Sequence, residues 1–336
     1  MAYVKILKNN LYHNLSYFQN ILGDKDKICV ALKDNAYGHG ICEIASLLYD
    51  YGVKHVFVKN DEEAIKIKNI PFDSILVMYG TNKINFNNKF HKAINCIEDL
   101  ENLPQYSNIE IKIDTGMHRN GILNEEIDLA IKLVKKNKLH LKGIFTHFSS
   151  SDTDIKYTLD QEKNFRKIIQ KFKKNFTNFR IHCSNTAATA YIDNEFYDVA
   201  RIGIGIYGYH PIKQYNKFLK PVMELYANRI STRKVFYAET IGYNRKFINI
   251  NKKDIIVSTY DLGYGDGLFR INECINYKLP NGKEILGIMS MDSFTIEGND
   301  NEVCFFNNVE KLASLFNTIP YEILVKISPF LKRVIE

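Results

Sequence analysis

The stretch Ile28–Gly40, ICVALKDNAYGHG, decides the fold, because an apolar run ends there in a lysine and a glycine-rich turn. Residues 28–32 predict a strand that is buried on both faces, since no polar residue alternates with the apolar ones. The next segment, residues 41–52, has apolar residues spaced three and four apart, which predicts a helix. Lys33 is therefore expected at the start of a βα-loop, where parallel α/β folds carry their chemistry.

The same rhythm of strand and helix recurs through the first two thirds of the chain. Residues 124–137 and 161–176 place apolar residues on one helical face and lysines on the other. Further strand-like runs begin near Lys54, Ser74, Lys92, Ile109, Leu141, Phe179 and Asp198. Eight repeats of this βα unit predict a closed (β/α)8 TIM-type barrel over residues 1–222.

The character of the sequence changes after Pro221. Alternating, β-branched and aromatic runs bounded by Gly, Asn and Asp fill the remainder of the chain, which is typical of antiparallel strands. We therefore predict an α/β protein in which the barrel is followed by a mainly β C-terminal domain over residues 223–336. The first few residues of the chain are candidates for the same β domain.

Composition narrows the class of protein. The 336 residues, 45% of them apolar, can build two full cores. The net charge of +7 is spread along the chain, so we do not expect nucleic-acid binding. The N-terminus is too polar for a signal peptide, and no run of about 18 apolar residues indicates a membrane span. Six scattered cysteines without a C-x-x-C pair indicate no metal site and reduced thiols, so we expect a cytoplasmic protein.

Polar residues gather where the predicted barrel strands end. The carboxyl ends of barrel strands share one face, so these side chains are expected to converge on one ligand. Arginine suits a carboxylate because its planar fork donates two hydrogen bonds, and backbone N–H groups at a helix start suit a phosphate. The residues at five strand ends are Lys33 and Tyr37, Arg119, His147, Asn185 and Thr186, and Arg201 with Gly203.

The octet KDNAYGHG, residues 33–40, resembles the cofactor-lysine signature of the alanine racemases, which use pyridoxal 5'-phosphate. Further segments resemble motifs of the same family in the same order, so the resemblance covers nearly the whole chain from Lys33 to Tyr321. These segments are residues 111–121, 143–152, 182–189, 200–208, 237–247, 261–267, 288–294 and 318–324.

The resemblance implies a cofactor site. Lys33 would hold pyridoxal phosphate as a Schiff base, His147 would pack beside the pyridine ring, and Arg201 would face the pyridine nitrogen. The other cofactor-binding residues implied by the family are Tyr37 and, at the phosphate, Asn185, Thr186, Gly203, Ile204 and Tyr321.

The resemblance also implies a substrate site. Racemisation removes a proton from one face of Cα and returns one to the other, so two bases are needed, and the family places them at Lys33 for the D-enantiomer and Tyr243 for the L-enantiomer. Lys112 matches a lysine that is carbamylated in many members, which orients the arginine matched by Arg119. The implied substrate-binding residues are Arg119, Tyr264, Met291 and Asp292.

The predicted function is therefore an alanine racemase that works by a two-base mechanism on a pyridoxal phosphate aldimine and supplies D-alanine for bacterial peptidoglycan. In the family the tyrosine base and the Met-Asp pair come from the partner subunit, which implies a homodimer with shared active sites. Three alternatives stay open: a racemase of the same fold for serine, lysine or another amino acid, a non-catalytic pyridoxal phosphate carrier, and a decarboxylase of similar architecture.

Some positions depart from the family pattern. The chain is short for the family, and its last residues, ISPFLKRVIE, lack the usual closing arginine-proline pattern. Asn120 and Thr186 replace residues that are more common in relatives. We expect part of the C-terminal substrate entrance to be trimmed, which bears on both the catalytic rate and the shape of the entrance.

Overall fold

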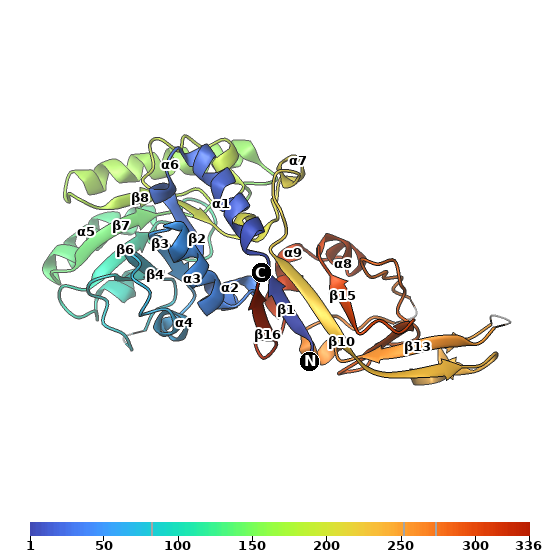
Figure 1. The fold of residues 1–336 in the computed structure, drawn as a ribbon. Helices are drawn as coiled ribbons and strands as arrows, with labels where there is room; N and C mark the ends of the chain where they lie inside the picture. The colour runs from blue at the N-terminus through green and yellow to red at the C-terminus, as the bar shows by residue number, and fades with distance from the viewer. Residues whose placement is uncertain (82, 251–252, 273) are drawn as a thin grey trace. The chain divides into compact units, whose positions relative to one another are not determined.

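The computed structural model describes residues 1–336 apart from 82, 251, 252 and 273. The chain folds into two compact units (Figure 1). The first, here called the barrel unit, comprises Asn10–Ala36 and Ile41–Lys220. The second, the β unit, comprises Met1–Asn9, Tyr37–Gly40 and Pro221–Glu336, so the end of the lysine loop belongs to it.

Parallel strands form the centre of the barrel unit, and each predicted strand-like run is a strand. Their spatial order is β8-β7-β6-β5-β4-β3-β2-β9, an eight-stranded sheet within the described residues. The edge strands approach each other through hydrogen bonds from Asp198 N to Ile181 O (3.0 Å) and from Arg201 N to Ser184 O (2.8 Å), so the sheet is nearly closed. The predicted barrel is thus confirmed. The strands are β2 (Ile28–Ala31), β3 (His55–Val58), β4 (Ser74–Val77), β5 (Phe90–Ile94), β6 (Asn108–Lys112), β7 (His140–Phe145), β8 (Arg180–His182) and β9 (Ala200–Ile202).

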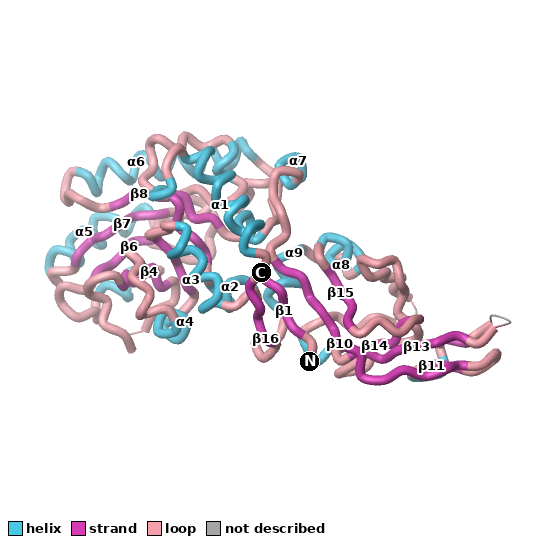
Figure 2. The backbone as a smooth tube through the Cα atoms, viewed as in Figure 1, coloured by secondary structure: helices cyan, strands magenta, loops and turns pink. Residues whose placement is uncertain are grey.

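Helices surround these strands (Figure 2). The amphipathic segments predicted from the sequence are helical: α5 buries Ile127, Ala130 and Val134 in the same apolar core as Ile109 and Ile144 of the strands. The helices are α1 (Lys8–Leu22), α3 (Ile41–Tyr51), α4 (Asp61–Lys66), α5 (Ile127–Lys136), α6 (Ile155–Lys173) and α7 (Lys213–Asn216), with short 3-10 turns η1 (Lys25–Lys27), η2 (Ile97–Leu100), η3 (Asn124–Glu126), η4 (Ala188–Ala190) and η5 (Ile204–Tyr207).

The β unit is built on a mixed sheet with the order β14-β13-β10-β1-β16, and β15 also pairs with β10. Its first strand comes from the start of the chain and pairs antiparallel with β10 and parallel with β16. The elements are β1 (Tyr3–Ile6), β10 (Met223–Val235), β11 (Thr240–Ile241), β12 (Phe247–Ile248), β13 (Ile255–Tyr260), β14 (Phe294–Glu297), β15 (Glu302–Phe306) and β16 (Lys332–Ile335), with helices α8 (Glu310–Leu315) and α9 (Pro320–Lys326) and turns η6 (Tyr243–Arg245) and η7 (Tyr264–Asp266).

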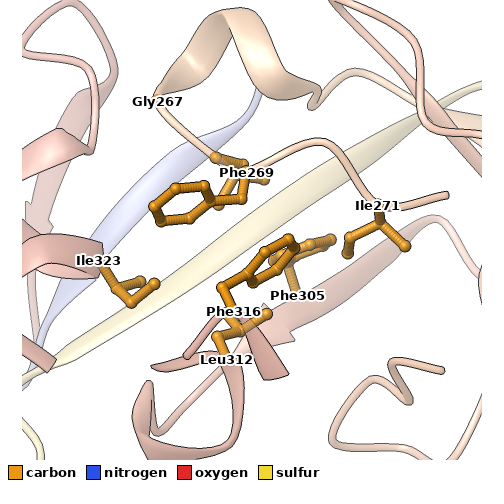
Figure 3. Close-up of a pocket in the computed structure, with 8 residues that line it drawn as sticks. Gly267, Phe269, Ile271, Phe305, Leu312, Phe316 and Ile323 are labelled. Carbon is orange, nitrogen blue, oxygen red and sulfur yellow. The ribbon is translucent and has the colours of Figure 1, made fainter. Parts of the chain in front are cut away.

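A small pocket in the β unit lies between side chains of its core (Figure 3). The rings of Phe269 and Phe316 stack there with centroids 4.8 Å apart. Its lining is apolar throughout, so this pocket has the character of core packing, not of a site for chemistry: Gly267, Leu268, Phe269, Ile271, Phe305, Leu312, Phe316 and Ile323. No helix in the described parts of the chain is both long and apolar enough to cross a lipid bilayer.

Candidate active site

The loop after β2 presents Lys33 at the carboxyl end of the strand, as predicted. The residues that follow form a short segment, α2 (Lys33–Tyr37), whose backbone is left-handed at Asp34, Asn35, Ala36 and Tyr37, with φ of 53°, 55°, 54° and 51°. Left-handed backbone disfavours residues with a Cβ by about 1–2 kcal/mol each. Such a turn persists when its surroundings hold it, and strain of this kind gathers at functional sites.

Three side chains, those of Glu63, Asn35 and Lys59, hold this turn in place. The Glu63 carboxylate accepts hydrogen bonds from Asn35 N (3.0 Å) and Lys59 N (2.8 Å). The Asn35 side chain accepts another from Ile41 N (3.0 Å), where α3 begins. The Lys59 ammonium also lies 2.9 Å from a carboxylate oxygen of Asp34. The glycine-rich turn expected from the sequence is thus a fixed left-handed turn, and Glu63 was not predicted from the sequence.

Arg201 lies buried on β9 and faces acceptors from two other strands. Its Nη2 donates to Thr146 O (2.5 Å) and Cys183 O (3.2 Å), and its Nη1 donates to His182 Nδ1 (2.8 Å). Burial lowers the pKa of Arg201 to about 10, so the guanidinium keeps its charge at neutral pH. A buried cation is thereby held at a defined position inside the barrel unit.

His147 lies within the electrostatic influence of four predicted cationic residues. Its Nδ1 is 3.4 Å from Arg201 Nη2. Burial lowers the pKa of His147 well below its ordinary value, and the positive charges of Arg201, Arg119, Lys112 and Lys33 lower it further. Together with His147, these side chains come from the ends of four strands, β2, β6, β7 and β9. The cluster suits an anionic ligand.

Lys112 ends β6 and is almost fully buried. Its ammonium donates to the Oδ1 atom of Asn120. Burial and then the charges of Arg119 and Arg201 lower the pKa of Lys112 to about 8, although Asp114 opposes them. Arg119 itself is exposed on the loop that follows. The Lys112 amine is therefore neutral far more often than an ordinary lysine.

Backbone N–H groups converge on one hydroxyl at the ends of β8 and β9. Thr186 Oγ1 accepts hydrogen bonds from Gly203 N (3.2 Å) and Gly205 N (3.3 Å). Ile204 begins η5 beside them. Asn185 exchanges hydrogen bonds with the Ser151 hydroxyl at 2.8–2.9 Å. The predicted Asn185, Thr186 and Gly203 thus share one corner of the barrel unit.

The segment that follows β8 opens a short helical turn at Asn185. The structure has the single 3-10 turn η4, over Ala188–Ala190. Asn185 Oδ1 does accept from Ala188 N (3.0 Å) at its start. The side chain of Asn194 donates to Thr189 O (2.9 Å), which gives this carbonyl a partner near the end of the turn.

In the β unit, two loops bring Tyr264, Met291 and Asp292 together. Tyr264 N donates to Ser290 O (3.2 Å), and Gly265 N donates to Met291 O (2.8 Å). A Cβ at Gly265 would approach Asp292 Oδ1 to 3.3 Å. The side chain of Met291 is 55% exposed, so this pair of loops forms a surface of the unit.

Tyr243 begins η6, between β11 and β12, and 57% of its surface is exposed. The residue before it, Gly242, has a φ of 73°, and a Cβ there would come within 3.7 Å of Ile288 N. The hairpin that carries Tyr243 therefore lies along the segment that leads into Met291.

Tyr37 and Tyr321 form a second pair in the β unit, with ring centroids 5.9 Å apart. The backbone at Gly38 approaches α9 so closely that a Cβ would lie 2.0 Å from Leu324 O. Arg333 also donates from Nη2 to Gly38 O (2.8 Å). Glycine is thus required in this part of the octet, because the backbone itself packs against a helix.

Sequence reasoning missed the polar residues inside the barrel unit. Glu110 and His182 are fully buried, and Glu110 Oε2 lies 2.7 Å from His182 Nε2. In the sequence, Glu110 alternates with Ile109 and Ile111, a pattern that fits a surface glutamate equally well. No group of three or more His, Cys, Asp or Glu side chains within the described residues is arranged to hold a metal ion.

The chain thus combines two features: a (β/α)8 barrel with a cationic site at its strand ends, and a separate mainly β unit. This combination defines a class of enzymes built from two units. The family described as the N-terminal domain of alanine racemase matches residues 6–211, and the C-terminal domain of alanine racemase matches residues 222–335. The chain belongs to the alanine racemase family, as the sequence motifs predicted.

Individual relatives agree with this assignment. The alanine racemase of Campylobacter jejuni subsp. doylei is 40% identical over 335 residues, which is 100% of both chains. That of Nitratiruptor sp. is 40% identical over 99% of both chains. Among solved structures, an alanine racemase of Clostridium difficile 630 is 28% identical with a TM-score of 0.89, over 100% of this chain and 95% of that one.

Proposed function

We propose that the chain interconverts L-alanine and D-alanine with pyridoxal 5'-phosphate as its cofactor and with Lys33 and Tyr243 as its two bases. The observation that carries this proposal is the gathering of Lys33, Lys112, Arg119 and Arg201 around His147. The chain is also 40% identical, over its full length, to an alanine racemase.

The residues present fit the cofactor. Its phosphate and phenolic oxygen are anionic, and the cationic cluster around His147 matches that charge. The hydroxyl of Thr186 and the backbone N–H of Gly203, which meet at 3.2 Å, offer donors for the phosphate. Asn185, Ile204 and Tyr321 complete the proposed phosphate site, and Tyr37, which packs on Tyr321, is proposed to support it.

Arg201 is proposed to face the pyridine nitrogen, with His147 beside the ring. A guanidinium has donors and no acceptor, so it leaves that nitrogen unprotonated. When bound, the cofactor withdraws the electrons left behind when Cα loses its proton, and an unprotonated ring is a weaker sink that suits simple proton movement.

The two bases then act on opposite faces of Cα. The amine of Lys33 takes the proton from D-alanine, while the phenol of Tyr243 returns one from the other side, and the roles reverse for L-alanine. Arg119 is proposed to bind the substrate carboxylate with Met291 and Asp292, and Tyr264 to line the entrance.

Lys112 is proposed to be carbamylated. The ammonium first gives up one proton. The neutral amine then attacks CO2, forms an N–C bond as one C–O π bond breaks, and loses a second proton to water, so a cation becomes an anion. The lowered pKa of Lys112, about 8, favours the neutral amine that this reaction needs. The resulting carbamate would lie near Arg119 and orient it.

We propose that the two domains predicted from the sequence have different roles. Residues 1–222 would bind the cofactor, and residues 223–336 would carry the second base. The exposure of Tyr243 (57%) and Met291 (55%) in the single chain supports a homodimer in which these residues complete the partner's site. We further propose a cytoplasmic enzyme that supplies D-alanine for peptidoglycan.

Reduction with borohydride tests the cofactor site. Protein loaded with pyridoxal phosphate should, after reduction and digestion, carry the pyridoxyl mass on the peptide that contains Lys33. The Lys33→Ala variant should lose this label and its turnover, while Lys156→Ala, at an exposed lysine, should keep both. A label on another lysine in the wild type would contradict the assignment of Lys33.

A further inference from the structure

A polar network occupies the interior of the barrel unit. Branched apolar side chains usually fill such a barrel. Here the carboxylate of Glu110 on β6 accepts from Arg180 Nη2 (2.5 Å) and Nε (3.2 Å), His91 Nδ1 (2.6 Å) and His182 Nε2 (2.7 Å). Burial alone would raise the pKa of Glu110, but Arg180 and the two histidines hold it well below its usual value. Glu110 is therefore a buried anion with a full set of donors.

The network fixes the protonation of His182. Arg201 Nη1 lies 2.8 Å from His182 Nδ1, and an arginine can only donate, so Nδ1 is the acceptor. The proton of the imidazole must then sit on Nε2, which donates to Glu110. Burial lowers the pKa of His182 to about 3, so the ring is neutral across the physiological range. His182 thus connects Glu110 and Arg201 in a single tautomer, donating from Nε2 to Glu110 and accepting at Nδ1 from Arg201.

Arg201 pairs with the imidazole of His182 and not with a carboxylate. Among the described residues, no carboxylate lies within salt-bridge distance of Arg201. Its other partners are the carbonyl oxygens of Thr146 and Cys183 and, at 3.4 Å, the Nδ1 atom of His147. The His182 ring is itself held by stacking on Phe145, with centroids 4.9 Å apart and an 11° interplanar angle. His182 is therefore the nearest side-chain acceptor of the guanidinium, at 2.8 Å against 3.4 Å for His147.

The neighbouring strand leaves space for this network. Gly143 on β7 is in register with Glu110 on one side and Arg180 on the other. A Cβ at Gly143 would lie 2.7 Å from Glu110 Oε2 and 3.0 Å from Arg180 Cγ. The ion pair fits because the residue between its partners, Gly143, carries no side chain.

We propose that Glu110 is a positioning residue for racemisation: it holds His182 in the Nε2–H tautomer, so that Nδ1 accepts from Arg201 and keeps the guanidinium directed at the cofactor ring. This role rests on the proposed function, in which Arg201 faces the pyridine nitrogen. Without the carboxylate, the Nδ1–H tautomer becomes accessible and would set a donor against a donor, so Arg201 would lose its nearest side-chain acceptor.

The test compares E110Q with H91N in the full-length protein loaded with pyridoxal phosphate. H91N is the matched control because it removes one partner of Glu110 and leaves the path to Arg201 untouched. The readouts are the His182 tautomer by nitrogen-15 NMR of labelled histidine, assigned by its loss in H182N, the visible absorbance of the bound cofactor, and kcat and KM for alanine.

We expect E110Q to populate the Nδ1–H tautomer of His182, to shift the cofactor absorbance, and to lower kcat by about 10–100-fold with a small change in KM, the usual effect of losing a partner that orients another residue. Wild-type tautomer and kcat in E110Q, or equal effects in H91N, would overturn the proposal.

The wild-type protein keeps the proposal falsifiable if E110Q does not fold. A wild-type His182 with its proton on Nδ1 would overturn it directly. The nitrogen-15 spectrum of His182 requires no turnover, so it can contradict the proposed tautomer whether or not the protein is a racemase. A protein that racemises nothing would overturn the function and, with it, the catalytic role of Glu110, whereas the tautomer itself would still be measured.

Discussion

A methyl group at Gly143 is the smallest change that tests how the barrel interior is packed. In Gly143→Ala the new Cβ would lie 2.7 Å from Glu110 Oε2 and 3.0 Å from Arg180 Cγ, closer than either neighbour tolerates. Overpacking a core disfavours folding by about 1–3 kcal/mol. We expect a cost of about 3 kcal/mol, the upper end of this range, because both neighbours belong to one buried ion pair. Replacing a glycine inside a strand stabilises the folded state by about 0.5–1 kcal/mol, which offsets part of that cost. The expected net loss is about 2 kcal/mol.

Hydrogen exchange measures this loss in the barrel unit alone, which matters because a chain of two units need not unfold in one step. Slowly exchanging amides of β6, β7 and β8 should lose about 2 kcal/mol of protection, or roughly 30-fold in exchange rate. A second change, Glu110→Asp, shortens the side chain that the methyl group meets. The double variant should therefore be less destabilised than the sum of the two single variants.

Two results would refute this reasoning. If the protection free energy of these amides in Gly143→Ala stays within a few tenths of a kcal/mol of the wild-type value, the interior has room for a methyl group. Strict additivity with Glu110→Asp would show that the loss arises away from the carboxylate.

Two further predictions concern buried ionisable groups. The pKa of Lys112 is about 8 in the folded chain against 10.5 in an unfolded one, so the unfolded state binds more protons between these values and stability should rise with pH from 8 to 10.5. Measured in buffer free of CO2, the unfolding free energy of wild type minus that of Lys112→Met should climb by up to about 1.4 kcal/mol per pH unit, and a flat difference would contradict the lowered pKa. Burial raises the pKa values of Cys29 and Cys183 to about 11 and about 12, so both thiols should resist a thiol reagent at pH 8 in the folded protein, and rapid labelling of either would contradict their burial. The thiols expected to react first are the exposed Cys42, Cys96 and Cys274.

Much of the architecture could be predicted because its signals are local. A strand buried on both faces needs a continuous apolar run, and ICVA over Ile28–Ala31 supplies one. The helix after the lysine loop shows its apolar face through residue spacing. The strand ends also converge for a geometric reason, which is why the gathering of Lys33, Arg119 and Arg201 around His147 could be anticipated.

The remainder depends on partners far away in the sequence. Glu110 is stabilised by His91, Arg180 and His182, which are 19, 70 and 72 residues away, so nothing next to it distinguishes a buried anion from a surface glutamate. The left-handed turn after Lys33 is held by Glu63, which lies 28 residues from Asn35.

The most direct test of the central claim follows the Cα proton of alanine in heavy water. With pyridoxal phosphate bound, L-alanine and D-alanine should each lose optical activity and gain deuterium at Cα, and neither change should occur without the cofactor. Tyr243→Phe should still bind the cofactor while turnover falls sharply. A wild-type protein that leaves protium at Cα and optical activity unchanged would contradict the assigned function, and full activity in Tyr243→Phe would contradict the second base.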